Sequence, residues 1–186
     1  MMKIAIILGS TRPGRIGESV AKWVFDLAKE RKDAEFEIVD VLDYNLPLYD
    51  EPYPAMMQNY TKEHTKKWSQ KIAEFDGYIF VTAEYNHSVP GALKNAIDYL
   101  NVEWQNKSAG FVSYGSAGGS RAVEHLRVIA AELHMADVRA QVMLSLFTDF
   151  VNMNEFKPDP RHIDEVHTML DQVIAWASAL KPLRNK

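Results

Sequence analysis

The feature that most constrains this chain is an alternation of short β-prone runs with longer segments of helical period. The β-prone runs occupy residues 4–8, 36–41, 78–82, 109–114 and 138–144. Several of them are apolar without interruption, which suits strands buried on both faces of a parallel sheet. Because an amphipathic segment follows each run, the sequence predicts a doubly wound α/β sheet of five strands and five helices.

Apolar residues at helical spacing define the predicted helices. They recur over residues 16–27, 61–75, 90–100, 123–133 and 159–177. The last helix is expected to take Asp159 as its N-cap and Pro160 at its first position. Ile163 is expected to open the apolar stripe that this helix buries.

The length and composition are those of a single folded domain over residues 1–186. The chain is 47% apolar and 25% charged, which supplies enough hydrophobic material for one core. Its net charge is −4, with acids and bases interspersed. This pattern provides no broad basic surface for nucleic acid or anionic lipid, so small molecules are the expected partners.

The chain has no cysteine. Disulfides, zinc–thiolate sites, iron–sulfur clusters and thiol nucleophiles are therefore excluded, and redox chemistry would need an organic cofactor. The apolar run at residues 4–8 is shorter than the hydrophobic region of a secretory signal, and no window approaches the length of a membrane span. No membrane association and a cytoplasmic location are expected.

The loop at residues 9–19 follows the first strand and has the composition of a phosphate site. It combines hydroxyls, glycines and two arginines where the free N–H groups of a helix start are expected. It lacks the Gly-Lys-Ser/Thr of a P-loop and the glycine spacing of a dinucleotide fingerprint, which argues against ATP and against NAD bound in the Rossmann manner. An ordinary capped helix start is the alternative.

Two further loops are expected at the same edge of the sheet, where ligands bind in doubly wound folds. Residues 83–91 mix polar groups with the rings of Tyr85 and His87, and residues 114–120 are rich in glycine. The first loop can line a flat heterocycle, and the second allows close approach of its backbone. Each loop taken alone is equally compatible with simple packing and chain reversal.

Together these segments resemble the NAD(P)H-dependent FMN reductase family, which includes quinone, chromate and azo-dye reductases. The matching segments are residues 8–12, 46–50, 84–98, 112–115 and 118–119, in the family's order. The resemblance implies a flavodoxin-like three-layer sandwich with strand order 2-1-3-4-5. It also implies bound FMN, NADPH or NADH as electron donor, and a small-molecule electron acceptor such as a quinone, an azo compound or free flavin.

The resemblance also implies which residues bind FMN. Those implied at the phosphate are Ser10, Arg12 and Ser19, with Gly17 and Glu18 beside them at the helix start. Those implied around the ribityl chain and the ring are Ala83, Glu84, Tyr85, Asn86, Ser113, Gly115 and Ser116. Ala83 departs from the family, which often has proline at that position. Family members commonly form dimers or tetramers, so a homodimer or homotetramer is expected, with residues 47–60 as a candidate interface or a loop packed on its own domain.

No catalytic side chain and no metal site are expected, because a flavin itself performs the hydride chemistry. His87 is a candidate proton donor to a reduced quinone, or a solvated loop histidine. His162 and His167 are five positions apart, which separates them by roughly 140° around a helix and does not suit a metal pair. Two other functions stay open: a flavodoxin-type electron carrier that does not oxidise nicotinamide, and a regulatory domain that senses a phosphorylated ligand.

Overall fold

The computed structural model describes residues 1–184, and its centre is a five-stranded parallel sheet in the order β2-β1-β3-β4-β5. Residues 185 and 186, at the end of the predicted domain, lie outside the described residues. The strands are β1 (Met2–Leu8), β2 (Ala34–Asp40), β3 (Gly77–Ala83), β4 (Ser108–Gly115) and β5 (Ala136–Ser145). The predicted strand count and order are confirmed.

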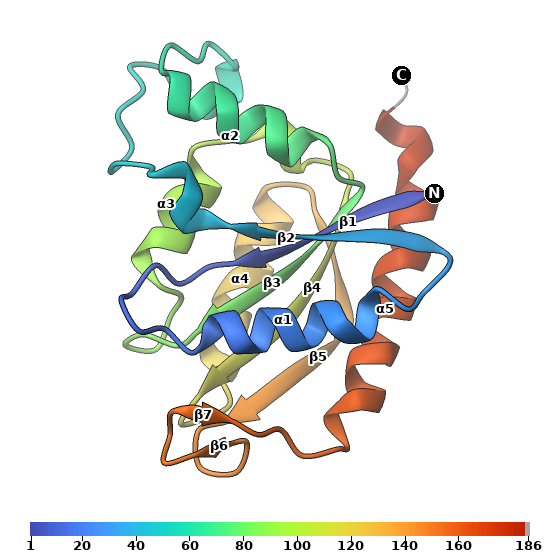
Figure 1. The fold of residues 1–186 in the computed structure, drawn as a ribbon. Coiled ribbons are helices and arrows are strands. Elements are labelled where there is room, and N and C mark those ends of the chain that lie inside the picture. The colour runs from blue at the N-terminus through green and yellow to red at the C-terminus, as the bar shows by residue number, and fades with distance from the viewer. Residues whose placement is uncertain (185–186) are drawn as a thin grey trace.

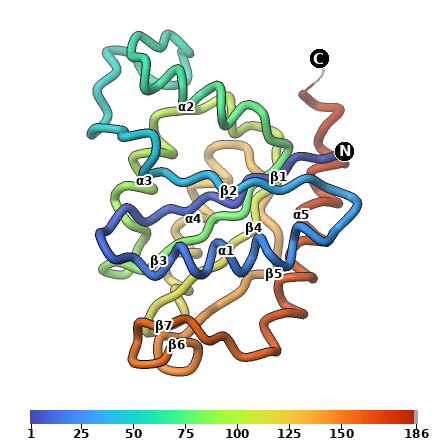
Figure 2. Tube along the Cα trace, in the orientation of Figure 1, coloured from blue at the N-terminus to red at the C-terminus, as the bar shows by residue number. Residues whose placement is uncertain are grey.

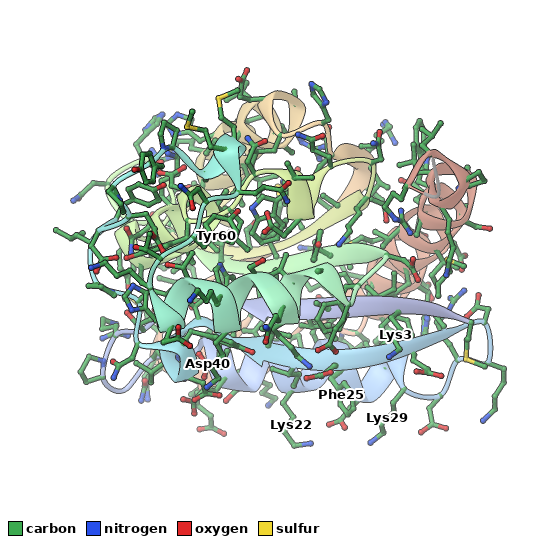
Figure 3. All side chains as sticks on the ribbon, turned by 90° about the horizontal axis from the view of Figure 1, so that it is seen from above. Lys3, Lys22, Phe25, Lys29, Asp40 and Tyr60 are labelled. Carbon is green, nitrogen blue, oxygen red and sulfur yellow. The ribbon has the colours of Figure 1, made fainter. Side chains whose placement is uncertain are left out.

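The register brings the carboxyl ends of the strands to one edge of the sheet. Leu8 of β1 is opposite Asp40 of β2 and Val81 of β3, and Gly115 of β4 is opposite Ser145 of β5. Figure 3 labels Lys3 and Asp40 at opposite ends of the sheet, which mark its amino and carboxyl edges. The three predicted ligand loops therefore leave the sheet at the same edge.

Helices cover both faces of the sheet (Figure 1). On one face lie α1 (Gly17–Ala28) and α5 (His162–Leu180), and on the other lie α2 (Glu63–Ala73), α3 (Gly91–Asp98) and α4 (Ser120–Glu132). Short 3₁₀ helices occupy Val41–Tyr44, Ala55–Met57, Val102–Trp104 and Lys181–Arg184. The helix-covered faces explain why the strands are apolar without alternation.

Each face has its own hydrophobic core, because successive side chains of a strand point to opposite faces. Ile4 and Ile6 of β1 belong to the core under α1 and α5, whereas Ala5 and Ile7 belong to the core under α2, α3 and α4. In the second core the Trp68 indole is fully buried and donates a 2.8 Å hydrogen bond to a backbone carbonyl. Both cores are continuous along the sheet, so the loops at its carboxyl edge rest on a rigid base.

The amino edge of the sheet lies close to both ends of the described chain, as the traces in Figures 1 and 2 show. Asp76, just before β3, accepts a 3.0 Å hydrogen bond from the Lys3 amide and forms ion pairs with Lys181 and Arg184. These contacts hold the first strand and the C-terminal 3₁₀ helix at this edge. Within residues 1–184 no helix is long and apolar enough to cross a membrane.

The predicted start of the last helix is wrong in two respects. The α5 helix begins at His162 with Arg161 as N-cap, and Asp159 instead accepts a 2.9 Å hydrogen bond from the Arg161 amide in the preceding turn. Ile163 is 39% exposed, and His162 takes the buried position. The cause is a tertiary contact, because a buried carboxylate outside the helix bonds the His162 ring and keeps it in the interior.

That carboxylate belongs to Asp149, within a connection that contains two short strands. They are β6 (Phe150–Val151) and β7 (Glu155–Phe156), which pair as an antiparallel hairpin. No sequence pattern predicted them, since two-residue strands carry no periodicity. The hairpin lies beyond the carboxyl ends of β4 and β5 (Figure 1).

Candidate functional site

The loop that follows β1 provides free hydrogen-bond donors where α1 begins. Among the residues that the structure describes, the amide N–H groups of Gly17 and Glu18 have no bonded acceptor. The Ser19 amide donates to the Ile16 carbonyl at 3.2 Å. Because the first N–H groups of a helix lie at the positive end of its dipole, this end of α1 can bind an anion such as a phosphate.

The two arginines of this loop differ in their surroundings. The Arg15 side chain is 5% exposed and forms ion pairs with Glu18 and with Asp40, at the carboxyl end of β2 (Figure 3). Arg12 is exposed, and its guanidinium donates one long hydrogen bond of 3.5 Å to the Gly14 carbonyl. Arg15 therefore holds the loop to the sheet, whereas Arg12 has donors to offer a ligand.

Gly17 allows close contact between α1 and β4. A Cβ atom at this position would lie 2.6 Å from the Tyr114 hydroxyl oxygen and 2.9 Å from a methyl carbon of Leu8. Both distances are too short, so a larger residue would displace the phenol. Burial raises the pKa of Tyr114 to about 12, and the phenol keeps its proton as a hydrogen-bond donor at neutral pH.

The loop that follows β3 reverses direction at Asn86 and His87. Tyr85 and Ser88 exchange amide hydrogen bonds of 2.9 and 3.1 Å, and the two residues between them have φ angles of 48° and 73°. Positive φ at both central positions is typical of a type I′ turn. The turn holds Tyr85 against the first loop, where its hydroxyl lies 3.2 Å from the Ser10 hydroxyl.

Glu84 connects the loop after β3 to the end of β4 and to the start of α4. Its side chain is 5% exposed, forms an ion pair with Arg121 and accepts a 3.3 Å hydrogen bond from the Arg121 amide. Its own amide donates to the Tyr114 carbonyl at 3.1 Å. A Cβ atom on Gly115 would lie 3.2 Å from the Glu84 Cβ, so the glycine allows the loop after β3 to approach the end of β4.

The serines at the end of β4 and in the loop after it have different environments. The Ser113 side chain is fully buried and donates a 2.7 Å hydrogen bond to the Gly118 carbonyl. It fixes the turn at Gly118 and Gly119, both of which have positive φ. Ser116 is exposed at the tip of the loop. Of the two hydroxyls, only that of Ser116 is open to a ligand.

The loops after β1 and β3, the end of β4 and the chain after β5 surround one pocket of about 180 Å³. Its lining residues are Ser10, Arg12, Arg15, Ile16, Ala83, Glu84, Tyr85, Tyr114, Leu146 and Met153. Binding pockets for small molecules usually have volumes of roughly 300–1,000 Å³. This pocket therefore accommodates only part of a small-molecule ligand of ordinary size.

The structure brings many of the predicted site residues together. The ones that line the pocket are Ser10, Arg12, Ala83, Glu84 and Tyr85. The ones in the first turn of α1 are Gly17, Glu18 and Ser19, and the ones in adjoining turns and strand ends are Asn86, Ser113, Gly115 and Ser116. Glu18 is paired with Arg15, and the Ser113 hydroxyl is used within the protein.

Several pocket residues were missed by the sequence analysis. Tyr114 lies in one of the segments that resemble the family, residues 112–115. Its position at the end of a buried strand was the feature that pointed to the site. Arg15 was recognised as part of the loop without its pairing to Asp40, which is 25 residues away. Leu146 and Met153 had no signal, because they follow the last strand in a segment without periodicity.

The histidines considered for metal binding do not form a ligand set. The His162 ring contacts the carboxylates of Asp149, at 3.0 Å through Nε2, and Glu165, at 2.7 Å through Nδ1. Within residues 1–184, no group of three or more His, Cys, Asp or Glu side chains is arranged to hold a metal ion. His162 thus serves to attach the start of α5 to the segment that follows β5.

Comparison with known proteins associates this architecture with flavin enzymes. The family model for NADPH-dependent FMN reductase matches residues 2–149. The chain is 51% identical over 128 residues to the NAD(P)H-dependent FMN reductase ntnL of Nectria sp, a match that covers 66% of this chain and 64% of that relative. It is 31% identical over 185 residues to a 2-hydroxy-1,4-benzoquinone reductase of Burkholderia sp, covering 94% of this chain and 96% of the relative.

A solved structure supports the same fold. FerB, a flavoenzyme NAD(P)H:(acceptor) oxidoreductase from Paracoccus denitrificans, superposes with a TM-score of 0.75 at 20% sequence identity. The match covers 96% of this chain and 98% of FerB. At this level of identity the likeness shows a shared architecture, which is the flavodoxin-like sandwich expected from the sequence.

Proposed function

The chain belongs to the NADPH-dependent FMN reductase family, with FMN as cofactor and NAD(P)H as electron donor, and we propose that its pocket at the carboxyl edge of the sheet holds the FMN phosphate. The single observation that carries this placement is that hydrogen-bond donors with spare capacity lie together in one loop. Two free amides begin α1, and the exposed Arg12 guanidinium lies in the same loop. A phosphate dianion needs such donors and benefits from positive charge.

The residues present fit a phosphate group. The Arg12 guanidinium and the Ser10 and Tyr85 hydroxyls line one pocket. Because the two hydroxyls share a hydrogen bond, one of them and the guanidinium can donate to an anion. The acidic groups nearby each have a cationic partner, since Glu18 and Asp40 share Arg15 and Glu84 pairs with Arg121. The pocket therefore presents donors to an anion without an unpaired carboxylate to repel it.

The flavin ring is proposed to lie against the turns that follow β3 and β4. When bound, FMN supplies the chemistry of accepting a hydride and releasing electrons to an acceptor. The type I′ turn fixes Tyr85 and Asn86, and Gly115 lets backbone amides come close to a flat ligand. The chain's own contribution is to orient the ring and to limit water around it, so no side chain is assigned as an acid or base.

A quinone or a similar aromatic acceptor is the proposed substrate. The Burkholderia sp relative is named for the reduction of 2-hydroxy-1,4-benzoquinone, and other relatives are named quinone reductases. The exposed His87 stands beside Tyr85 in the same turn, where it can meet an acceptor that approaches from solvent. The flavodoxin-type carrier is not favoured, because the matching relatives are named as nicotinamide-dependent reductases.

Two expectations from the sequence stay predictions: assembly into a homodimer or homotetramer, and a cytoplasmic location. Exposed apolar side chains of the predicted interface segment support the first. They are Leu48, Tyr49, Tyr53, Met56 and Met57. The mass in solution, measured by light scattering, tests the assembly, and imaging of the tagged protein tests the location.

The function is tested by adding FMN and then NADPH to the purified protein. Saturable FMN binding followed by rapid bleaching of the flavin absorbance, and recovery on addition of a benzoquinone, is the expected result. Bleaching that is slow with both NADPH and NADH would instead identify an electron carrier. A protein that binds no FMN would end the proposal.

A further inference from the structure

The segment that follows β5 contributes a wall to the same pocket. Leu146 and Met153 both line it, together with residues of the loops that follow β1 and β3. The family model ends at residue 149, so the turn that carries Met153 lies outside the part of the chain that the family model matches. The contribution of this segment therefore has to be argued from the structure of this chain.

The segment is firmly attached to the rest of the site. The Leu146 amide donates a 3.1 Å hydrogen bond to the Gly115 carbonyl, at the end of β4. Phe150 is 5% exposed and packs against Tyr114 and Phe156, with ring centroids 6.2 and 5.1 Å apart. These contacts fix the hairpin relative to the pocket wall that Tyr114 provides.

The buried Asp149 carboxylate fastens both ends of the segment. It accepts hydrogen bonds of 2.8 Å from the Ser145 amide and 3.0 Å from the Asp159 amide, and it contacts His162 of α5. Burial alone would raise the pKa of Asp149, but these donors, the Thr148 hydroxyl and the nearby His162 hold it below its ordinary value. The carboxylate is therefore charged and fully bonded at neutral pH.

The tip of the hairpin has an unusual residue for its backbone conformation. Asn154 donates to the Val151 carbonyl at 3.1 Å, and the residues between them, Asn152 and Met153, have φ angles of 50° and 56°. Turns with two positive φ angles favour Asn followed by Gly. Methionine at the second position is strained relative to glycine, and strained positions of this kind cluster at ligand sites.

We propose that residues 146–156 form a fourth wall of the FMN site, in which Leu146 and Met153 contact the bound cofactor and slow its release. The proposal rests on the proposed function, because it requires FMN in the pocket. With the cofactor bound, the apolar side chains of Leu146 and Met153 would exclude water from their part of the pocket. Exclusion of water strengthens the interaction between Arg12 and a phosphate.

The test uses Met153→Gly, because glycine suits the turn and removes only the side chain. The ligand-free variant is expected to unfold at the same temperature as the wild type or higher. Its FMN affinity is expected to fall about 5- to 10-fold, with a faster dissociation rate, because the Met153 side chain is 58% exposed without ligand and would be partly covered by the bound cofactor. FMN fluorescence measures both quantities without reference to activity.

The matched control is Asn152→Gly, which introduces glycine at the other positive-φ position of the same turn and keeps Met153. Its FMN affinity is expected to equal that of the wild type. Equal affinities for Met153→Gly and the wild type would overturn the fourth wall, as would an equal loss in both glycine variants. If the wild type itself binds no FMN, the proposed function fails and the fourth wall fails with it.

Discussion

The two edges of the central sheet both concentrate charged and aromatic groups, but they use them differently. At the amino edge, Lys107 is 4% exposed and donates to the Ile72 and Ala73 carbonyls and to the Tyr78 hydroxyl. At the carboxyl edge, the exposed Arg12 and the amides that start α1 have hydrogen-bonding capacity to spare. Unused donors, rather than charge or burial, distinguish a binding site from a structural network.

The carboxyl edge itself contains both kinds of group. Arg15 is buried and paired with Asp40 and Glu18, so it resembles Lys107 more than it resembles its neighbour Arg12. Two arginines of one loop thus separate into a group that holds the fold and a group that is free for a ligand. This contrast is open to direct tests.

Replacing Arg15 has the largest expected effect, and the quantity affected is the free energy of unfolding. Arg15→Ala leaves the Asp40 carboxylate without its buried partner, which is expected to lower the free energy of unfolding by about 3 kcal/mol. Urea denaturation of the FMN-free protein measures this loss. A variant as stable as the wild type would contradict the structural role of Arg15.

Replacing Arg12 is expected to spare stability and weaken FMN binding. Arg12→Ala should leave the free energy of unfolding within about 0.5 kcal/mol of the wild type, because the side chain is exposed. FMN affinity should fall by about 1.5–3 kcal/mol if the guanidinium bonds the phosphate. Fluorescence titration with FMN measures the affinity, and an unchanged value would remove Arg12 from the site.

Replacing Lys107 tests the amino edge through its pH dependence. Burial lowers the pKa of Lys107 to about 7 from 10.5. Between these values the unfolded chain binds the proton that the folded protein releases, so the free energy of unfolding rises with pH. Relative to Lys107→Met, the wild type should gain about 1.4 kcal/mol from pH 8 to pH 9.

The control for this measurement is Lys94→Met, at an exposed lysine that pairs with Asp98 on α3. The control should show the same change with pH as the wild type. Denaturant unfolding at pH 7, 8 and 9 gives all three curves. Parallel curves for the wild type and Lys107→Met would show that Lys107 is charged in the folded protein.

The periodicity of the sequence predicted the strands and helices, because the burial of each element determines which of its positions are apolar. The unbroken run at residues 78–82 corresponds to β3, every residue of which is buried. The stripe at residues 16–27 corresponds to α1, where Val20 and Val24 are buried. These elements were predictable, since two-sided burial of a strand and one-sided burial of a helix leave patterns within a few neighbouring residues.

Prediction failed where a long-range partner changed a residue's position. The pattern placed Ile163 inside, but Asp149 holds His162 there instead. The Ser113 hydroxyl likewise bonds the Gly118 carbonyl, and the place of Ser113 in the cofactor site stays a prediction. Neither partnership is visible in the residue's own helix or strand pattern.

The sequence by itself determined the order of the elements, the edge of the sheet at which the ligand loops meet, and the residue types that suit a phosphate and a flat ring. Only the tertiary structure decided that the Arg15 guanidinium is paired with carboxylates of the protein, whereas the Arg12 guanidinium keeps donors for a ligand. It also decided that Met153 lines the pocket. The physical reason is that hydrophobic periodicity is a local property of the chain. Hydrogen bonds and ion pairs at a site join segments that are distant in sequence, and only the packed sheet brings those segments within bonding distance.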